Sequence, residues 1–215
     1  MNSQIQNWIE APAATPAPMQ IAILDAAAQS FTTHGFAAAS IDLIANQVGA
    51  TKGSVYYYYR SKADLFFAVH KRAMVMNLRE QVGIASDPDA SAAEKLESMA
   101  YKHAMLMMDY LYYQRVTVQG VELHQSASTT PAERTALEEV VAMRDAYEGL
   151  FVNVLKQGVK SKHFVAQDCA LAAKGILGML NWITVWFRPR ETDSPSFKQK
   201  IAKQFASQAL KSVSA

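Results

Sequence analysis

The sequence contains a single cysteine, Cys169, so no intramolecular disulfide can form and no CxxC spacing offers a metal site. The first twenty residues lack the basic start and the long apolar run of a signal peptide. No later stretch offers about 18 uncharged apolar residues, the length that a membrane span needs. We therefore expect a protein of the reducing cytoplasm, with no membrane partner and no bound metal.

The motifs of common catalytic sites are also missing. The five histidines form no HExxH pattern, and the chain has neither a glycine-rich phosphate loop nor a GxSxG sequence. Glu122 and His124 stand two residues apart, so one helical face cannot present both to a metal ion. We expect no cofactor and no catalytic residue. An enzyme without a recognisable motif is one alternative.

Charge of either sign is not in large excess, because the net charge is +2 over 215 residues. A nucleic-acid partner would therefore need positive charge that is concentrated locally. Residues 50–72 have such a concentration, with Asp64 as their one acidic residue. The basic residues of this segment are Lys52, Arg60, Lys62, Lys71 and Arg72.

The N-terminal residues 1–18 carry Pro12, Pro16 and Pro18 among alanines, a composition that resists a long helix. We predict a flexible arm there, in which Trp8 and Ile9 could order a short turn.

From about residue 17 the apolar spacing becomes helical. Three residues have the character of N-caps, Ser40, Thr51 and Ser61, and glycines that can end helices stand at Gly35 and Gly49. The sequence therefore predicts four helices before residue 90, of which the second and third are only about two turns long.

Ser91, Thr130 and Ser194 each begin a longer helix, the first two with a glutamate three residues on. Less marked helices are expected over about 116–124 and 167–187. Strand signals are weak throughout. We predict an all-α fold of about nine helices.

The third short helix has the properties of a DNA-reading element. Gly53 costs about 1 kcal/mol relative to alanine inside a helix, which indicates that something such as a DNA backbone approaches closely. Val55 and Tyr59 can turn inward. Hydroxyl and ammonium groups that favour phosphate near the helix N-terminus come from Thr51, Lys52, Tyr56 and Tyr57. Alternatively, the tyrosines pack between helices and the basic residues form a solvated face.

The segments ILDAAAQSFTTHGF and SIDLIANQVGATKGSVYYYYRSKADLF, within Ile21 to about Val69, closely resemble the TetR family of repressors. The resemblance implies an N-terminal three-helix DNA-binding domain with a helix-turn-helix, followed by an antiparallel helical domain for ligand binding and dimerisation. Many relatives have histidine in place of Tyr57 or Tyr58 and phenylalanine in place of Tyr59, so the base preference stays open.

The same resemblance implies roles for single residues. Ser40 would touch a phosphate, Tyr56 and Lys62 would hold phosphates, and the third helix would lie along the major groove. Base edges carry the sequence information, for which Lys52 and Tyr57 are the better candidates. The expected DNA contacts are Ser40, Thr51, Lys52, Gly53, Tyr56, Tyr57 and Lys62.

The helix that begins at Ser91 is rich in methionine and tyrosine through about Tyr113. Methionine adapts to irregular apolar partners, including ligands, although ordinary core filling is the alternative. Polar groups among the candidates would orient a ligand, or else serve a core or solvent-facing role. The candidates for an effector pocket are Met99, His103, Met107, Tyr110, Glu122, Trp182 and Trp186.

The stretch GMLNWITVWFRP, residues 178–189, resembles the NW…WYRP stretch of TetR-family members that control fatty-acid, sterol-ring or aromatic-acid catabolism and respond to acyl-CoA thioesters. Phe187 stands where tyrosine is common in those proteins. The resemblance implies an acyl-CoA or another hydrophobic acid as effector. Packing in a dimer is the alternative explanation for this stretch.

Small residues at Ala170, Ala173, Gly175 and Gly178 permit close approach of another helix, and the resemblance places the last two helices at a homodimer interface. A two-fold dimer would bind an inverted-repeat operator with half-sites about 34 Å apart. Repression relieved by a small effector is the mode that the family implies. A helical small-molecule-binding or interaction protein that binds no DNA is the other alternative.

We expect three regions. They are an arm over 1–18, a DNA-binding domain over 19–68 and an effector-binding and dimerisation domain over 69–215.

Overall fold

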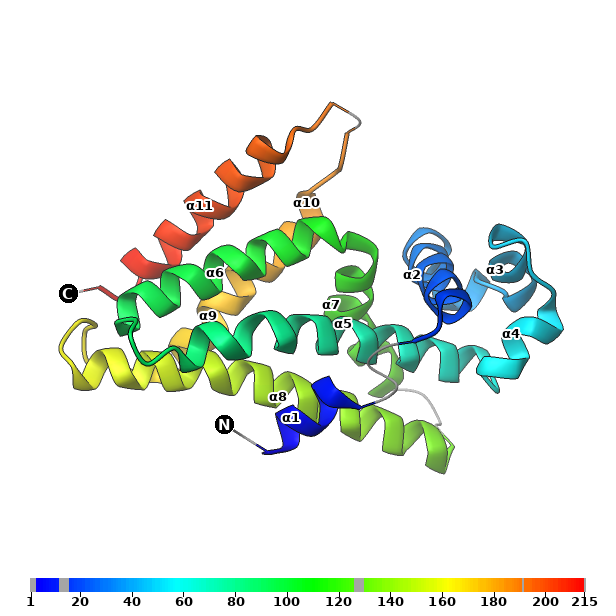
Figure 1. Ribbon diagram of the computed structural model, residues 1–215, viewed down its shortest axis with the longest axis horizontal. Coiled ribbons are helices and arrows are strands. Elements are labelled where there is room, and N and C mark those ends of the chain that lie inside the picture. Colours follow the sequence, from blue (N-terminus) through cyan, green and yellow to red (C-terminus); the bar gives the residue numbers. More distant parts are fainter. Residues whose placement is uncertain (1–2, 12–15, 126–129, 191, 215) are drawn as a thin grey trace. The chain divides into compact units, whose positions relative to one another are not determined.

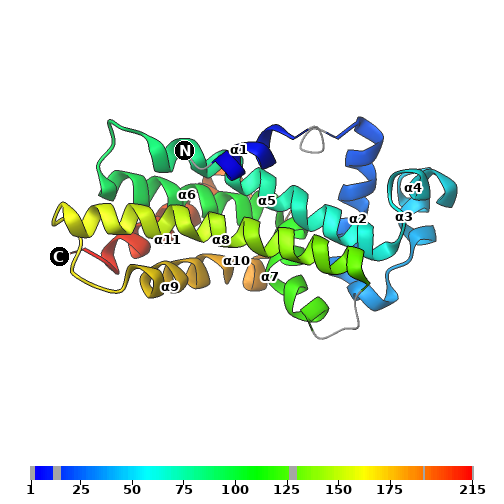
Figure 2. The same cartoon turned by 90° about the horizontal axis from the view of Figure 1, so that it is seen from below.

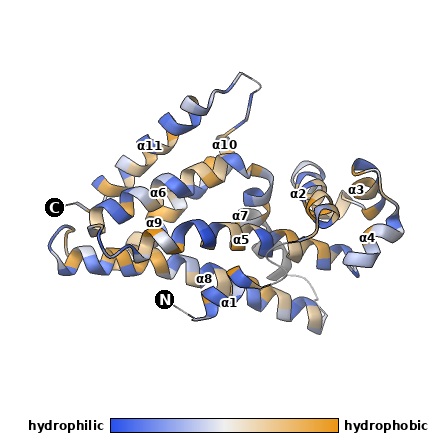
Figure 3. Cartoon of the chain, in the orientation of Figure 1, coloured by the Kyte–Doolittle hydropathy of each residue, from blue (hydrophilic) through white to orange (hydrophobic). Residues whose placement is uncertain are grey.

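The computed structural model describes residues 3–11, 16–125, 130–190 and 192–214, apart from the side chains of residues 119–125. Within these residues every element of regular secondary structure is a helix. β-type pairing is limited to one isolated bridge between Phe164 and Ser214. The predicted all-α fold is therefore confirmed. Most helices carry both hydrophilic and hydrophobic residues along their length, as expected of helices that bury one face (Figure 3).

Figure 1 shows the order of the helices. They are α1 (Ser3–Glu10), α2 (Pro18–Ala38), α3 (Ile41–Gln47), α4 (Lys52–Tyr58), α5 (Lys62–Ser86), α6 (Ala92–Asp109), α7 (Leu111–Gln125), α8 (Pro131–Lys160), α9 (Cys169–Asn181), α10 (Ile183–Trp186) and α11 (Pro195–Lys211).

The predicted helix starts are confirmed by side-chain hydrogen bonds to the backbone. The hydroxyls of Ser40, Thr51 and Ser194 each accept a bond from the N–H three residues on. Ser91 and Glu94 form the full reciprocal capping box. These bonds satisfy backbone donors that the first turn of a helix would otherwise leave unpaired.

The N-terminal residues differ from the predicted flexible arm. Ser3–Glu10 forms helix α1, in which Ile5 and Trp8 are buried. The prolines that argued against a helix all lie beyond residue 10 and do not interrupt it. Two apolar side chains three residues apart share one helical face, so their burial holds this short helix in place.

Two longer predicted helices are interrupted. The helix expected from Ser91 to about Tyr113 ends at Asp109, with Tyr110 outside helical geometry at ψ 40°. The helix expected over about 167–187 divides at Trp182, between α9 and the four-residue α10. The apolar pattern continues across both breaks, and this is why the sequence predicted single helices.

The chain forms two compact units. The N-terminal unit holds α1–α4, α5 up to Val75, and the segment 112–143. The C-terminal unit holds residues 76–111 and 144–215. The boundary predicted after residue 68 lies inside α5, a continuous helix that begins in one unit and ends in the other.

In the N-terminal unit, α3 packs against both α2 and α4. The start of α5 contributes Phe66, whose ring centroid lies 5.4 Å from that of Phe31 and 5.2 Å from that of Phe36. This aromatic cluster joins α2, on both sides of its kink at Gly35, to α5. The three helices of the predicted DNA-binding domain therefore have a core of their own.

In the C-terminal unit, α6 packs along α11 and contacts α9 and α10. Its inward face is apolar, and Leu96, Met99 and Met107 are almost completely buried. Lys174 of α9 forms an ion pair with Glu148 of α8, whose closest N–O distance is 2.6 Å, and the two helices lie side by side in Figure 2.

Candidate functional site

Helices α3 and α4 are joined by a tight turn at Gly49, which has a φ of +65°. Only glycine adopts this left-handed conformation at no steric cost, as predicted for the end of α3. The N–H of Ala50 donates to the carbonyl of Ala45 at 2.9 Å and closes the turn. Thr51 then caps α4. The result is two short helices with a connection of four residues, the geometry of a helix-turn-helix.

Helix α4 turns one face inward and the other to solvent. Val55 and Tyr59 are buried, as predicted, and burial raises the pKa of Tyr59 to about 12. Tyr56 and Tyr57 are exposed, and Tyr57 has an exposed fraction of 83%. An aromatic ring that projects this far contributes little to the core and is available to a partner.

The predicted DNA-contact residues of α4 share this outer face, on which Thr51, Lys52, Gly53, Tyr56 and Tyr57 are all exposed. A Cβ built at Gly53 would have one neighbour within 4 Å, the hydroxyl of Thr51 at 3.7 Å. Packing within the chain therefore does not require a glycine at this position. Among the described residues, nothing supplies the close approach that the sequence suggested at Gly53.

The ammonium of Lys52 forms an ion pair with Asp42 of α3, with a distance of 2.8 Å between Nζ and Oδ2. The hydrogen bond to Asp42 raises the pKa of Lys52 above its ordinary value. Asp42 therefore offsets part of the charge of the cation that the sequence offers for base readout. Lys71 is likewise paired, with Glu139 at 2.6 Å. The basic segment is less positive than its composition indicates.

Ser40 and Lys62 both bond to the backbone near the start of α3. The Ser40 hydroxyl caps α3, and the Lys62 ammonium donates to the carbonyl oxygens of Phe36 and Ala37 at the end of α2 and of Ala39 just after it. Both side chains are therefore engaged with the backbone in the structure, where the family resemblance implied phosphate contacts.

The effector candidates of α6 lie in the core of the C-terminal unit. Met99, His103 and Met107 are buried on one side of the helix. His103 lies between two polar partners, the hydroxyl of Tyr147 at 2.7 Å from Nδ1 and Oδ1 of Asn181 at 3.0 Å from Nε2. Burial lowers the pKa of His103 to about 4, although the bond to Asn181 opposes the shift. The imidazole is therefore neutral near pH 7.

The directions of these bonds follow from their chemistry. Because Oδ1 of Asn181 only accepts, the proton of the neutral ring is on Nε2, and Nδ1 accepts from Tyr147. The Tyr147 oxygen in turn accepts from the side-chain amide of Gln81 at 3.2 Å, and this amide also donates to the carbonyl of Met99 at 2.9 Å. A directed path of hydrogen bonds thus runs from α5 through α8 and α6 to the end of α9.

One buried acceptor on this path is unused. The side-chain oxygen of Gln81 has no hydrogen-bond partner among the described residues, although the side chain is fully buried. A buried polar atom without a partner is costly, by about 1–3 kcal/mol. Gln81, Tyr147 and Asn181 had no sequence signal of their own, except that Asn181 lies in the distinctive stretch 178–189.

The other effector candidates do not join this group. Trp182 has an exposed fraction of 62%, and Tyr110 and Trp186 are also exposed. Trp186 stacks on Phe205 of α11, with a centroid distance of 6.1 Å. Glu122 lies outside the residues whose side chains the structure describes.

One outer face of α9 is apolar and includes two glycines. Leu171, Gly175, Gly178 and Trp182 are exposed at spacings of three and four residues, which places them on one stripe. A Cβ built at either glycine would meet none of the other side chains or backbone segments that the structure describes within 4 Å. Ala173, by contrast, is buried in the core. The stripe is open to a partner helix.

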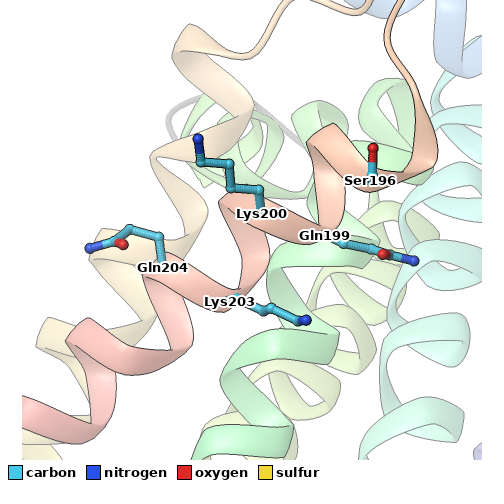
Figure 4. Close-up of a pocket in the computed structure, with 5 residues that line it drawn as sticks. All are labelled: Ser196, Gln199, Lys200, Lys203 and Gln204. Atoms are coloured by element: carbon cyan, nitrogen blue, oxygen red, sulfur yellow. The ribbon is translucent and has the colours of Figure 1, made fainter.

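A hollow on α11 is lined by polar side chains of this single helix, and Figure 4 shows them pointing in different directions. They are Ser196, Gln199, Lys200, Lys203 and Gln204. Because they do not converge on a common point, this surface has no built ligand site. Among the described residues, no three side chains of histidine, cysteine, aspartate or glutamate come together to hold a metal.

One segment of the described chain, Cys169–Trp186, is long and apolar enough to cross a membrane by length and composition, with a mean hydropathy of 1.3. It contains Lys174, which is paired with Glu148, and its helix is interrupted at Trp182.

Two known domain families match this chain. Residues 23–69 match the domain described as bacterial regulatory proteins, tetR family, and residues 89–213 match the tetracyclin repressor-like C-terminal domain. The apolar segment of α9 and α10 is thus part of this C-terminal domain. The fatty acid metabolism regulator protein of Bacillus subtilis (strain 168) is 25% identical over 174 residues, 79% of this chain and 84% of that protein.

Solved structures agree. The TetR family transcriptional regulator PfmR from Thermus thermophilus has a TM-score of 0.73 at 27% identity, covering 88% of this chain and 97% of that one. AibR, solved in complex with isovaleryl coenzyme A and operator DNA, has a TM-score of 0.70 at 20% identity, covering 89% and 95%. The protein is therefore a transcriptional regulator and not an enzyme, and it belongs to the TetR family.

Proposed function

We propose that this regulator is a cytoplasmic repressor that binds an inverted-repeat operator as a homodimer and leaves it when a small hydrophobic effector binds. The observation that carries the DNA half is the outer face of α4, where polar and aromatic side chains are exposed without a role in the core. Thr51, Lys52, Gly53, Tyr56 and Tyr57 would follow the major groove, with Ser40 beside a phosphate.

Selection of operators from a pool of random duplexes tests the DNA half. We expect the wild-type chain to enrich an inverted repeat with half-sites about one turn, roughly 34 Å, apart. Tyr56→Phe should weaken binding to every duplex by a similar factor, because a phosphate contact carries no sequence information. Tyr57→Ala should instead change the enriched bases. If no duplex is enriched over bulk DNA, the proposal is wrong.

Effector binding is proposed for the core of the C-terminal unit, around His103 and the methionines of α6. The buried polar path ending at Asn181, with an unused acceptor on Gln81, supports this location, since binding sites combine apolar walls with a few convergent polar groups. AibR was solved with isovaleryl coenzyme A, and the Bacillus relative is named for fatty acid metabolism. These likenesses support an acyl-CoA thioester as the effector class.

Isothermal titration with a panel of CoA thioesters of increasing acyl length tests the effector class, with free CoA as the control. We expect one range of acyl lengths to bind and, at the same concentrations, to release the selected operator. Release requires that the effector bind the DNA-free state more tightly than the DNA-bound state. Absence of binding by the whole panel would exclude this effector class and leave the DNA proposal intact.

The homodimer is proposed to form through the last helices, with the exposed stripe of α9 against its copy. Glycines on this stripe leave room for the backbone of a partner helix. Leu171 and Trp182 would supply the apolar area that such an interface buries.

A further inference from the structure

Lys62, the first residue of α5, has its ammonium group on three backbone carbonyls at the place where α2 ends and the loop to α3 begins. The distances from Nζ are 2.7 Å to the oxygen of Phe36, 3.0 Å to that of Ala37 and 2.9 Å to that of Ala39. An ammonium group has three N–H donors and no acceptor. Each donor therefore has a carbonyl within hydrogen-bond distance, and the group is fully satisfied within the chain.

The three carbonyls lie where α2 gives way to α3. The chain leaves helical geometry at Gly35, with a φ of +77°, and Ser40 caps α3 five residues later. Carbonyls at the end of a helix lack partners in the helix and carry partial negative charge. A cation held there is favourable, and it fixes the path of the chain into α3.

The ring of Phe36 strengthens the same contact. Its centroid lies 4.7 Å from Nζ of Lys62 and 5.2 Å from the ring of Phe66, one turn along α5. The first turn of α5 thus holds the loop through a charged side chain and an aromatic one. The loop cannot move without losing both contacts.

We propose that Lys62 is a positioning residue of the helix-turn-helix, which fixes the start of α3 through the loop carbonyls and does not bind an operator phosphate. The inference rests on the proposed DNA binding of α3 and α4. It departs from the role that the family resemblance implied. A phosphate oxygen would have to replace one of three short bonds that the ammonium already makes.

Lys62→Arg separates the two roles. Arginine keeps the positive charge and suits phosphate well, but its planar fork cannot direct three donors from one nitrogen onto three converging carbonyls. We expect Lys62→Arg and Lys62→Ala to lower operator affinity alike, by about tenfold or more, with the slope of log affinity against log salt unchanged. A phosphate contact would instead survive in Lys62→Arg, and Lys62→Ala would lower the slope by about one.

Thermal unfolding without DNA provides a readout that a phosphate contact would not move. Both Lys62 variants should unfold at a lower temperature than the wild type, whereas Lys52→Ala, which removes an exposed lysine of α4, should not. Hydrogen exchange should quicken at the amide of Leu43, which Ser40 caps. These readouts hold even if the chain selects no operator. Unchanged melting and exchange in Lys62→Arg would overturn the positioning role.

Discussion

The hydroxyl of Tyr147 donates a hydrogen bond of 2.7 Å to Nδ1 of His103, in a part of the core where both side chains are almost completely buried. This bond joins α8 to α6 within the C-terminal unit. Through Gln81 and Asn181 it extends to α5 and α9. Buried polar groups are stable only when they are paired, so each member of this path depends on the next.

Removal of the shared hydroxyl should therefore destabilise the fold. Tyr147→Phe leaves Nδ1 of His103 without its donor and one N–H of Gln81 without its acceptor. We expect the free energy of unfolding to fall by about 1–3 kcal/mol, as measured by urea denaturation. Tyr112→Phe, at an exposed tyrosine, should change it by less than about 0.5 kcal/mol. Equal effects of the two variants would contradict a contribution of these buried hydrogen bonds to stability.

The depressed pKa of His103 predicts a pH dependence of stability. The pKa is about 4 in the folded chain, against 6.5 for the ordinary group, because burial disfavours the charged ring. The unfolded chain therefore binds a proton that the folded chain does not, and stability falls as the pH drops from about 6.5 toward 4. Over that window we expect a loss of about 3 kcal/mol from this group.

Chemical denaturation at a series of pH values measures this loss. His103→Gln keeps a polar side chain but cannot titrate, so its stability should be lower at pH 7 and should lose less between pH 6.5 and 4 than that of the wild type. His163→Gln, at an exposed histidine, should follow the wild-type curve. A wild-type curve that parallels His103→Gln would show that His103 does not titrate as described.

The elements that the sequence predicted correctly depend on local chemistry. The caps at Ser40, Thr51 and Ser91 and the left-handed Gly49 need only neighbours within a few residues, and each is found in the structure. The buried Val55 follows from helical periodicity alone. The exposed face of α4 could also be predicted, because it consists of the positions that the same periodicity leaves outside the buried face.

The parts that the sequence could not predict depend on partners far along the chain. Tyr147 lies 44 residues from His103, and Asn181 lies 78 residues from it. The sequence offered His103 as a polar group of a pocket, with a core or solvent-facing role as the alternative, but it could not show which polar groups would meet it. The pairing of Lys52 with Asp42 has a related cause, since Asp42 lies outside the basic segment, in the helix before it.

The Lys52–Asp42 ion pair predicts an effect on DNA binding. Asp42→Asn keeps the size of the side chain but releases the Lys52 ammonium from its 2.8 Å partner. We expect affinity for random duplex DNA to rise several-fold at low salt, and the salt slope to steepen by about one, because one more cation can displace counterions. Fluorescence anisotropy at several salt concentrations measures both. Asp87→Asn, which removes the same charge from the C-terminal unit, should leave the slope unchanged. An unchanged slope in Asp42→Asn would mean that Lys52 already contacts phosphate in the wild type.

The exposed stripe of α9 predicts how the chain assembles. Leu171 has an exposed fraction of 66% in the single chain, so a charge at this position should cost little there. Within an interface the same charge would be buried without a partner, which is strongly unfavourable. We therefore expect Leu171→Glu to convert a dimer to a monomer in light scattering and to lose operator affinity, while its circular dichroism spectrum stays helical. Tyr112→Glu adds the same charge at an exposed position of α7 and should remain dimeric. A dimeric Leu171→Glu would place the interface elsewhere than on α9.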